Sequence, residues 1–227
     1  MTTNVTQAFL EAFRTQELLS NSEIKNIISV IEEIIAAYPD PITFFSHKSQ
    51  DSLDVLKAAL QRALSTERDF QVLMVLFGSL LTDEWLANLA RIIGDTVAER
   101  EKAVTWWFSS IMNDNLTQAM GRSLLLFSRH IKEHRPEEFR REFIVFLSRS
   151  GDLRRFALAA SVLDDDDKVL LEPLKGFLLK FHDVDASIRE TRAARKELNE
   201  VATAIKAVIR KIEGKPEQKK WWKLWKL

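Results

Sequence analysis

Apolar residues recur every three or four positions along most of the chain, the spacing that places side chains on one face of an α-helix. The clearest stripe is formed by isoleucines within residues 24–35, and Ser20 and Glu23 form a capping box before it. Comparable stripes predict helices over residues 9–19, 53–64, 70–81, 85–93, 97–111, 116–131, 139–147, 153–160 and 170–181. No segment alternates with the period of two that is typical of a strand. We therefore predict an all-α protein.

Residues that start or stop helices lie between these stripes. Thr82 is a predicted N-cap, and Pro136, followed by two glutamates, is a predicted helix start. The pair Gly94-Asp95 predicts a break or kink. The four aspartates at 164–167 predict an N-cap and an acidic first turn for the next helix. We read His182-Asp183 as a turn in which Asp183 caps the following helix.

Residues 184–212 carry a heptad pattern with alternating steps of four and three. Its positions are Val184, Ile188, Thr191, Arg195, Leu198, Ala202, Ile205, Ile209 and Ile212. The pattern predicts one long helix that packs on its own body. Alternatively, it is a coiled-coil helix that self-associates into a homo-oligomer through Ile188, Leu198, Ile205, Ile209 and Ile212. Gly214 is the predicted left-handed cap, and Pro216 prevents continuation.

These elements predict about ten short helices and one long C-terminal heptad helix. We expect a helical body over residues 1–182, the heptad helix over 183–213 and a tail over 214–227. Short connections favour a compact multi-helix bundle. A small α-solenoid is the alternative, although no motif recurs at a fixed period. The only candidate boundary inside the body is residues 38–50.

The tail separates aromatic from cationic residues. On a helix, Trp221, Trp222, Leu224 and Trp225 fall on one arc, opposite lysines that include Lys220, Lys223 and Lys226. From Lys215 onward there are five lysines and one glutamate, which gives a net charge of +4 before the terminal carboxylate. Because the formal net charge of the whole chain is zero, residues 1–214 carry a net charge of −4. Tryptophan suits a lipid headgroup layer, and lysine suits an anionic surface. The tail therefore predicts attachment to an anionic membrane surface or to a groove on a protein partner, whereas packing on the chain's own core is the alternative.

Composition narrows the class of protein. Apolar residues make up 46% of the chain and charged residues 29%, as in ordinary soluble proteins. The chain has no cysteine, which fits a reducing compartment. The first ten residues lack the pattern of a secretory signal, and no apolar run is long enough to span a bilayer. We expect a cytoplasmic protein, with peripheral attachment to the inner face of the membrane through the tail.

One string has an enzyme-like pattern. His130-Ile131-Lys132-Glu133-His134 is similar to the H-x-x-E-H pattern of inverted zinc proteases. Its histidines lie one turn apart on a helix and could share a zinc ion, with Glu133 as the general base. The surrounding cations Arg129, Lys132 and Arg135 would repel a metal ion, which favours a solvated helix end.

The remaining charged residues indicate a function less clearly. Arg140, Arg141, Arg149, Arg154 and Arg155 form a modest basic patch diluted by glutamates, so we do not expect nucleic acid as a partner. The chain has no phosphate-binding loop, dinucleotide turn or serine nucleophile motif, so we expect no cofactor. The sequence therefore predicts a non-enzymatic interaction or adaptor protein. The alternative is a metal-dependent hydrolase that uses His130, Glu133 and His134.

Overall fold

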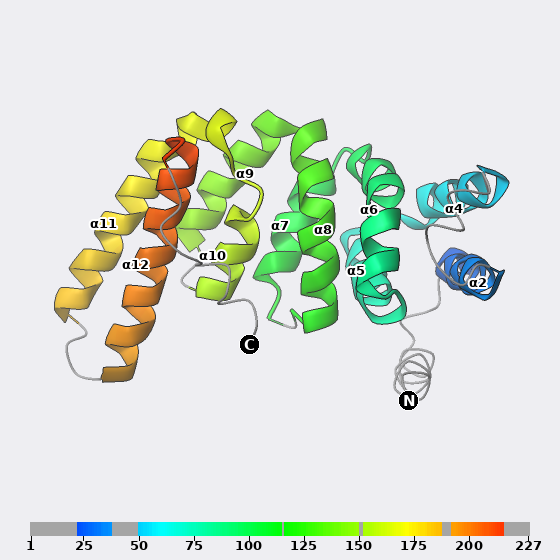
Figure 1. Ribbon diagram of the computed structural model, residues 1–227, viewed down its shortest axis with the longest axis horizontal. Coiled ribbons are helices and arrows are strands. Elements are labelled where there is room, and N and C mark those ends of the chain that lie inside the picture. The colour runs from blue at the N-terminus through cyan, green and yellow to red at the C-terminus, as the bar shows by residue number, and fades with distance from the viewer. Residues whose placement is uncertain (1–21, 38–49, 115, 150–151, 188–191, 216–227) are drawn as a thin grey trace. The chain divides into compact units, whose positions relative to one another are not determined.

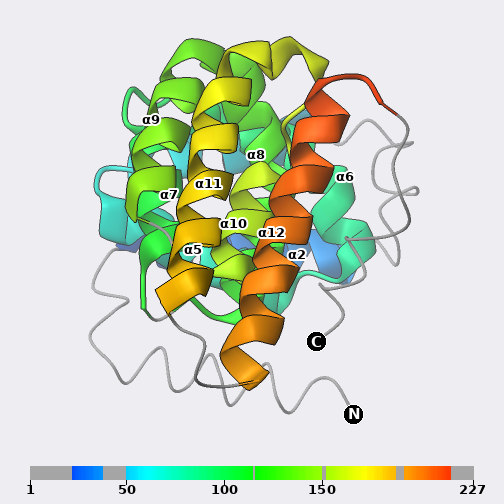
Figure 2. The ribbon, with the colours of Figure 1, turned by 90° about the vertical axis from the view of Figure 1, so that its left-hand side faces the viewer.

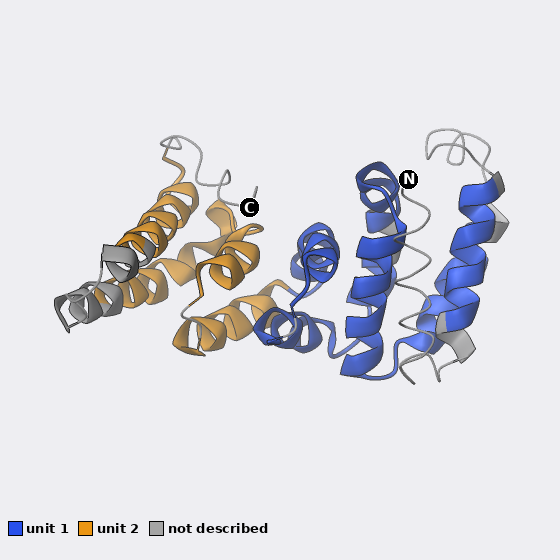
Figure 3. Cartoon of the chain, turned by 90° about the horizontal axis from the view of Figure 1, so that it is seen from below, with its two compact units in different colours: residues 1–135 blue, residues 136–227 orange. Residues whose placement is uncertain are grey.

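The computed structural model describes residues 22–37, 50–114, 116–149, 152–187 and 192–215. These residues form ten α-helices and one 3-10 helix, with no strand among them, which confirms the predicted all-α class. The chain divides into two compact units, Met1–Arg135 and Pro136–Leu227 (Figure 3). The structure thus divides the expected single body at a position that the sequence analysis did not mark. The choice between a bundle and a solenoid stays a prediction.

The first unit contains six described helices, which Figure 1 labels. They are α2 (Ser22–Ala37), α4 (Gln50–Ala63), α5 (Glu67–Leu80), α6 (Asp83–Ala98), α7 (Ala103–Met112) and α8 (Gln118–His134). Helix α8 packs against α5, α6 and α7, and α2 packs against α4. The isoleucine stripe of α2 is largely buried, as its spacing predicts.

Helices α5 and α8 approach each other closely in the core of this unit. A Cβ atom added at Gly78 would lie 1.8 Å from the carbonyl oxygen of Ala119, so no side chain fits there. Nearby, Phe77 and Phe127 meet edge to face, with their ring centroids 6.0 Å apart. The indole nitrogen of the buried Trp107 donates a hydrogen bond of 3.0 Å to the carbonyl oxygen of Leu124.

Arg122 on α8 holds the junction between α5 and α6. Its guanidinium donates hydrogen bonds to the carbonyl oxygens of Gly78, at 2.7 Å, and Leu81, at 3.3 Å, and pairs with the carboxylate of Asp83. Thr82 caps α6 as predicted, because its hydroxyl accepts a hydrogen bond from the amide of Trp85 at 3.3 Å.

The predicted break at Gly94-Asp95 is wrong, since α6 continues through both residues to Ala98. Gly94 instead allows α8 to come close: an added Cβ would lie 2.7 Å from Cδ2 of His130. The local sequence does not distinguish a glycine that allows two helices to pack closely from a glycine that ends a helix. The helix ends four residues later, in a turn over residues 99–102.

The second unit contains five described helical elements. They are α9 (Pro136–Arg149), α10 (Leu153–Ala160), the 3-10 helix η1 (Asp165–Leu170), α11 (Leu171–Ser187) and α12 (Arg192–Ile212). Helix α11 packs against α9, and α12 packs against α10, η1 and α11 (Figure 2). Pro136 starts α9 as predicted, and Asp152 caps α10 by accepting hydrogen bonds from the amides of Arg154 and Arg155.

The structure does not support one continuous heptad helix over residues 183–213. Residues 182–187 belong to α11, and α12 begins at Arg192; the two helices pack against each other, which a single straight helix cannot do. His182 and Asp183 therefore lie within a helix, so the predicted turn and the predicted cap at Asp183 are wrong. Heptad spacing also suits a helix that packs on a neighbour within one bundle, which is why the pattern did not reveal two helices.

Several sequence predictions fall outside the described residues. They are the helix over 9–19, the candidate boundary over 38–49, Ile188 and the tail from residue 216. Within the described ranges, no helix is both long and apolar enough to cross a membrane.

Candidate functional site

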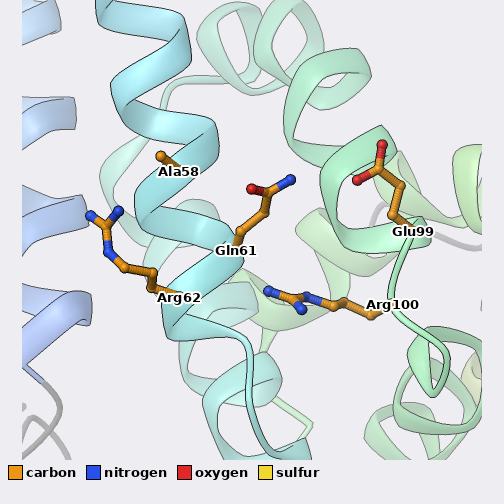
Figure 4. A pocket seen from close by; sticks show the side chains of 5 residues that line it. All are labelled: Ala58, Gln61, Arg62, Glu99 and Arg100. Carbon is orange, nitrogen blue, oxygen red and sulfur yellow. The ribbon is translucent and has the colours of Figure 1, made fainter.

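The first unit contains a cavity between the end of α4 and the turn that joins α6 to α7 (Figure 4). Its volume is about 420 Å³, within the size range of small-molecule sites. Ala58, Gln61 and Arg62 of α4 form one side, and Glu99 and Arg100 of the turn form the other. Two arginines, one glutamate and one amide thus surround a space where helix α4 packs against α6.

Helix ends explain why polar side chains gather there. Apolar residues of α4, including Leu56 and Leu60, are buried, which leaves Gln61 and Arg62 on the exposed side of the last turn. On the opposite side, α6 ends at Ala98, and backbone hydrogen bonds hold the turn that carries Arg100. The amide of Arg100 donates to the carbonyl oxygen of Val97 at 3.0 Å, and the carbonyl of Arg100 accepts from the amide of Ala103 at 3.1 Å.

Arg100 is the most unusual group of the cavity. Its Nε atom is buried, and among the described residues this N–H has no hydrogen-bond partner. Figure 4 shows its side chain extending from the turn toward α4 and Gln61, whereas the carboxylate of Glu99 points away from the guanidinium and Arg62 extends to the other side of α4. The side chains of Arg100 and Gln61 thus line the cavity from facing sides.

The sequence analysis did not find this cavity. Gln61 and Arg100 are far apart in the sequence, and each lies near the end of an ordinary amphipathic helix. Their proximity depends on how α4 packs against α6, and no local pattern encodes that. No sequence signal could therefore have identified the pair.

The three candidate metal ligands take part in three separate interactions. His130 lies with its Nδ1 atom 3.2 Å from the Asp95 carboxylate, and its side chain is 18% exposed. The carboxylate of Glu133 accepts a 2.7 Å hydrogen bond from Arg129, and Nδ1 of His134 lies 3.0 Å from the carbonyl oxygen of His130. In the part of the chain that the structure describes, no group of three or more histidines and carboxylates could hold a metal ion.

The aspartate run has the predicted capping role together with an ion pair that was not predicted. Asp164 caps η1, and Asp167 completes a capping box by accepting from the amide of Asp164 at 3.0 Å. Asp167 is 0% exposed and accepts a 2.9 Å hydrogen bond from Nε of Arg140 on α9. Arg140 also donates to Glu137 and to the carbonyl oxygen of Asp166. The hydrogen bond to Asp167 raises the pKa of Arg140, and burial opposes this shift. Arg140 of the predicted basic patch is thus part of a buried ion pair.

Three of the candidate assembly residues of α12 are buried in the second unit. Ile205 and Ile212 are 0% exposed, and Ile209 is 9% exposed. Leu198 lies in α12, whereas Ile188 lies outside the described residues. The C-terminal half of the stripe is thus buried in the second unit, and the choice between packing on the chain's own body and self-association stays a prediction.

The end of α12 determines where the tail begins. Gly214 has a φ of 68°, and its amide donates to the carbonyl oxygen of Lys211 at 3.1 Å. The amide of Lys215 donates to the carbonyl oxygen of Arg210 at 2.9 Å, which completes a Schellman motif. This confirms the predicted left-handed cap. A hydrogen bond from the Lys215 ammonium lowers the pKa of the Glu213 carboxyl. Both Gly214 and Lys215 are exposed, so the segment that carries Lys220, Trp221, Trp222, Lys223, Leu224, Trp225 and Lys226 starts at the surface of the second unit.

Comparisons of this chain with protein-family models, with curated proteins and with solved structures found no match.

Proposed function

We propose that this chain is a non-enzymatic interaction protein that is attached to an anionic membrane surface by its C-terminal segment, residues 216–227. Its helical units would recognise a protein partner, and the tail would hold the complex at the surface. The observation that carries this proposal is the division of the tail into tryptophans and lysines, directly after a helix cap whose residues are exposed.

The cap supports attachment because it ends α12 sharply. The Schellman motif at Gly214 stops the helix, and Pro216 follows two residues later. The helix that carries the buried stripe therefore ends before the tail begins. A segment of twelve residues is too short to cross a bilayer, but an amphipathic segment of this kind can lie in the headgroup layer.

The hydrolase alternative has less support. It would require His130, Glu133 and His134 to leave Asp95, Arg129 and the helix backbone and to converge on one ion. Elemental analysis of the purified protein separates the two functions. We expect no stoichiometric zinc, whereas one zinc per chain that is lost on His130→Ala would favour the hydrolase.

Co-sedimentation with lipid vesicles tests the attachment. Each lysine near an anionic surface contributes about 1 kcal/mol to binding, and salt weakens this contribution. We expect the intact chain to bind vesicles that contain phosphatidylserine, and replacing Lys219, Lys220, Lys223 and Lys226 by glutamine to weaken binding at least tenfold. Neutral vesicles or high salt should weaken binding of the intact chain in the same direction.

A control with the same change of net charge replaces four exposed lysines elsewhere, Lys25, Lys102, Lys168 and Lys206, by glutamine. This variant should bind as the intact chain does. Equal weakening in both variants would show that overall charge, and not the tail, causes binding. If the intact chain binds no vesicles but deletion of residues 219–227 releases a co-purifying protein, the tail attaches to a partner protein and the membrane proposal is wrong.

A further inference from the structure

We propose that an exposed face of η1 and α11 is a docking surface for the tail of this same chain, residues 219–227, in the absence of a membrane. This surface, the α11 face, consists of Val169, Glu172, Gly176 and Leu179, all of which are exposed. A docked tail is not available to lipid, so the surface would regulate attachment. That regulation rests on the proposed function, whereas the contact itself does not.

The α11 face carries two large apolar side chains that the second unit leaves uncovered. Leu179 is 64% exposed and Val169 is 63% exposed, more than any other large apolar residue in the described part of the chain. Steps of three, four and three residues separate the four positions of the face, which places them along one side of the helical segment. An amphipathic segment laid along this side would remove both apolar side chains from water.

Gly176 lies in the middle of the α11 face, and packing within the second unit does not require it. In the described part of the chain, nothing lies within 4 Å of a Cβ atom added at Gly176, although the residue is helical. Glycine in the middle of a helix is destabilising relative to alanine. By contrast, Gly78 and Gly94 each allow α8 to approach their helix closely. Gly176 offers the same close approach on an exposed side of α11, which favours contact with a segment outside the described residues.

The end of α12 lies beside this face. Helix α12 packs against η1 and α11, and Figure 2 shows its C-terminal end level with the start of α11. The pKa of the Lys175 ammonium on α11 is raised mainly by its 2.9 Å hydrogen bond to Glu172 and further by the charge of Glu213, directly after α12. Glu213 therefore lies close to α11. Because the exposed Lys215 follows two residues later, the tail begins next to the α11 face.

The tail is long enough to reach and cover the face. Residues 216–218 form a spacer, and an extended chain spans about 3.5 Å per residue, so the spacer reaches about 10 Å. In a helix, with a rise of about 1.5 Å per residue, the stretch from Val169 to Leu179 is about 15 Å long and residues 219–227 are about 12 Å long. One tail therefore matches one face in length.

Charge favours one direction of docking. Asp165 and Asp166 lie just before the α11 face, both are exposed, and neither carboxylate is in an ion pair with another described residue. Lys168 offsets one of these two charges, so this end of the face stays negative. Lys219 and Lys220 open the tail and would meet the carboxylates first, because their long side chains can reach beyond a contact made by the apolar arc. The tryptophans would then lie over the rest of the face, only partly shielded from water because the face is narrow.

Quenching of tryptophan fluorescence by acrylamide, in the full chain without lipid, tests the contact. Trp85, Trp106 and Trp107 are buried, and a chain that ends at Gln218 supplies their contribution for subtraction. The reference for an undocked tail is a synthetic peptide of residues 216–227. We expect the quenching constant of the tail indoles in the intact chain to be at least twofold lower than that of the peptide.

Two variants of the face should remove this protection. Leu179→Lys replaces an exposed apolar side chain by a charge that repels the tail. Gly176→Gln adds a side chain where the tail would approach, and it should not impair folding, because the position is open and glutamine is the better helix former. Both variants should raise the quenching constant to that of the peptide. Val55→Lys, at a 50% exposed position on α4 in the first unit, is the matched control and should change nothing.

Binding to phosphatidylserine vesicles tests the regulation separately. A tail that is partly docked binds lipid with an affinity reduced by its undocked fraction. We therefore expect Gly176→Gln, which leaves the net charge unchanged, to bind these vesicles at least threefold more tightly than the intact chain. Equal vesicle binding by the two chains would overturn the regulation.

The docking contact would be overturned by tail indoles that are quenched in the intact chain as in the peptide, or by protection that both face variants retain. Protection that disappears on dilution would assign the face to the tail of a second copy and would also overturn the proposal. If neither chain binds vesicles but the quenching results are as expected, membrane attachment is wrong and the docking contact stands. The two proposals can therefore fail independently.

Discussion

At the scale of single residues, two glycines and one ion pair show what the sequence could not reveal. Gly78 and Gly94 are both required by a close approach of α8, although neither lies in a turn. Asp167 has the capping role that its position predicts, yet its burial and its pairing with Arg140 depend on how α9 packs near η1. Local sequence predicts caps, whereas contacts between distant helices decide which residues are buried.

Replacing Gly78 by alanine should destabilise the first unit. The added methyl group would overlap the backbone of Ala119, which cannot move without shifting α8, so we expect a loss of about 1–3 kcal/mol in the free energy of unfolding. Gly121→Ala is the matched control on α8, because nothing lies within 4 Å of its added Cβ; it should be neutral or stabilising by up to about 1 kcal/mol. Urea unfolding measures both, and equal effects would contradict the close approach.

Replacing Asp167 by asparagine should remove the buried carboxylate that pairs with Arg140. Removing one partner of a buried ion pair costs about 3–5 kcal/mol, and we expect the lower end because Arg140 keeps Glu137 and is itself 16% exposed. Asp166→Asn, at an exposed neighbouring position, should change the free energy of unfolding by less than about 0.5 kcal/mol. Similar unfolding midpoints for the two variants would show that the pair is not stabilising.

At the scale of elements, hydrophobic spacing predicted the helices and capping residues predicted several of their ends. Thr82, Pro136 and Gly214 lie where the helices begin or end, as predicted. The boundary between α11 and α12 was missed because the heptad spacing continues across it. Spacing describes which face is apolar, but it does not identify the neighbour that covers that face. The cavity was missed for the same reason, since one of its walls comes from α4 and the other from the turn after α6.

Replacing Ile205 by alanine tests whether α12 packs within its own unit. Ile205 is 0% exposed, so the cavity left behind should lower the free energy of unfolding by about 2–5 kcal/mol. The exposed neighbour Lys206→Ala should change it by less than about 0.5 kcal/mol. The unfolding midpoint of both variants should be independent of protein concentration. A midpoint that rises with concentration, and loses this dependence in Ile205→Ala, would instead indicate a self-association helix.

At the scale of the whole molecule, the chain consists of two compact units, the second of which leads into a basic tail. From Lys215 onward the net charge is +4 before the terminal carboxylate, whereas residues 1–214 carry a net charge of −4. This asymmetry favours contact between the tail and an anionic surface, while the rest of the chain is repelled. The six tryptophans are likewise divided between the first unit and the tail. Trp85, Trp106 and Trp107 are buried in the first unit, and the other three belong to the tail.

Tryptophan fluorescence therefore tests the attachment most directly, because the three buried indoles should not respond to lipid. On addition of phosphatidylserine vesicles to the intact chain, we expect the emission to shift to shorter wavelength as Trp221, Trp222 and Trp225 enter the headgroup layer. A chain that ends at Gln218 should show no shift. An unchanged spectrum of the intact chain, or an equal shift in the shortened chain, would contradict membrane attachment through the tail.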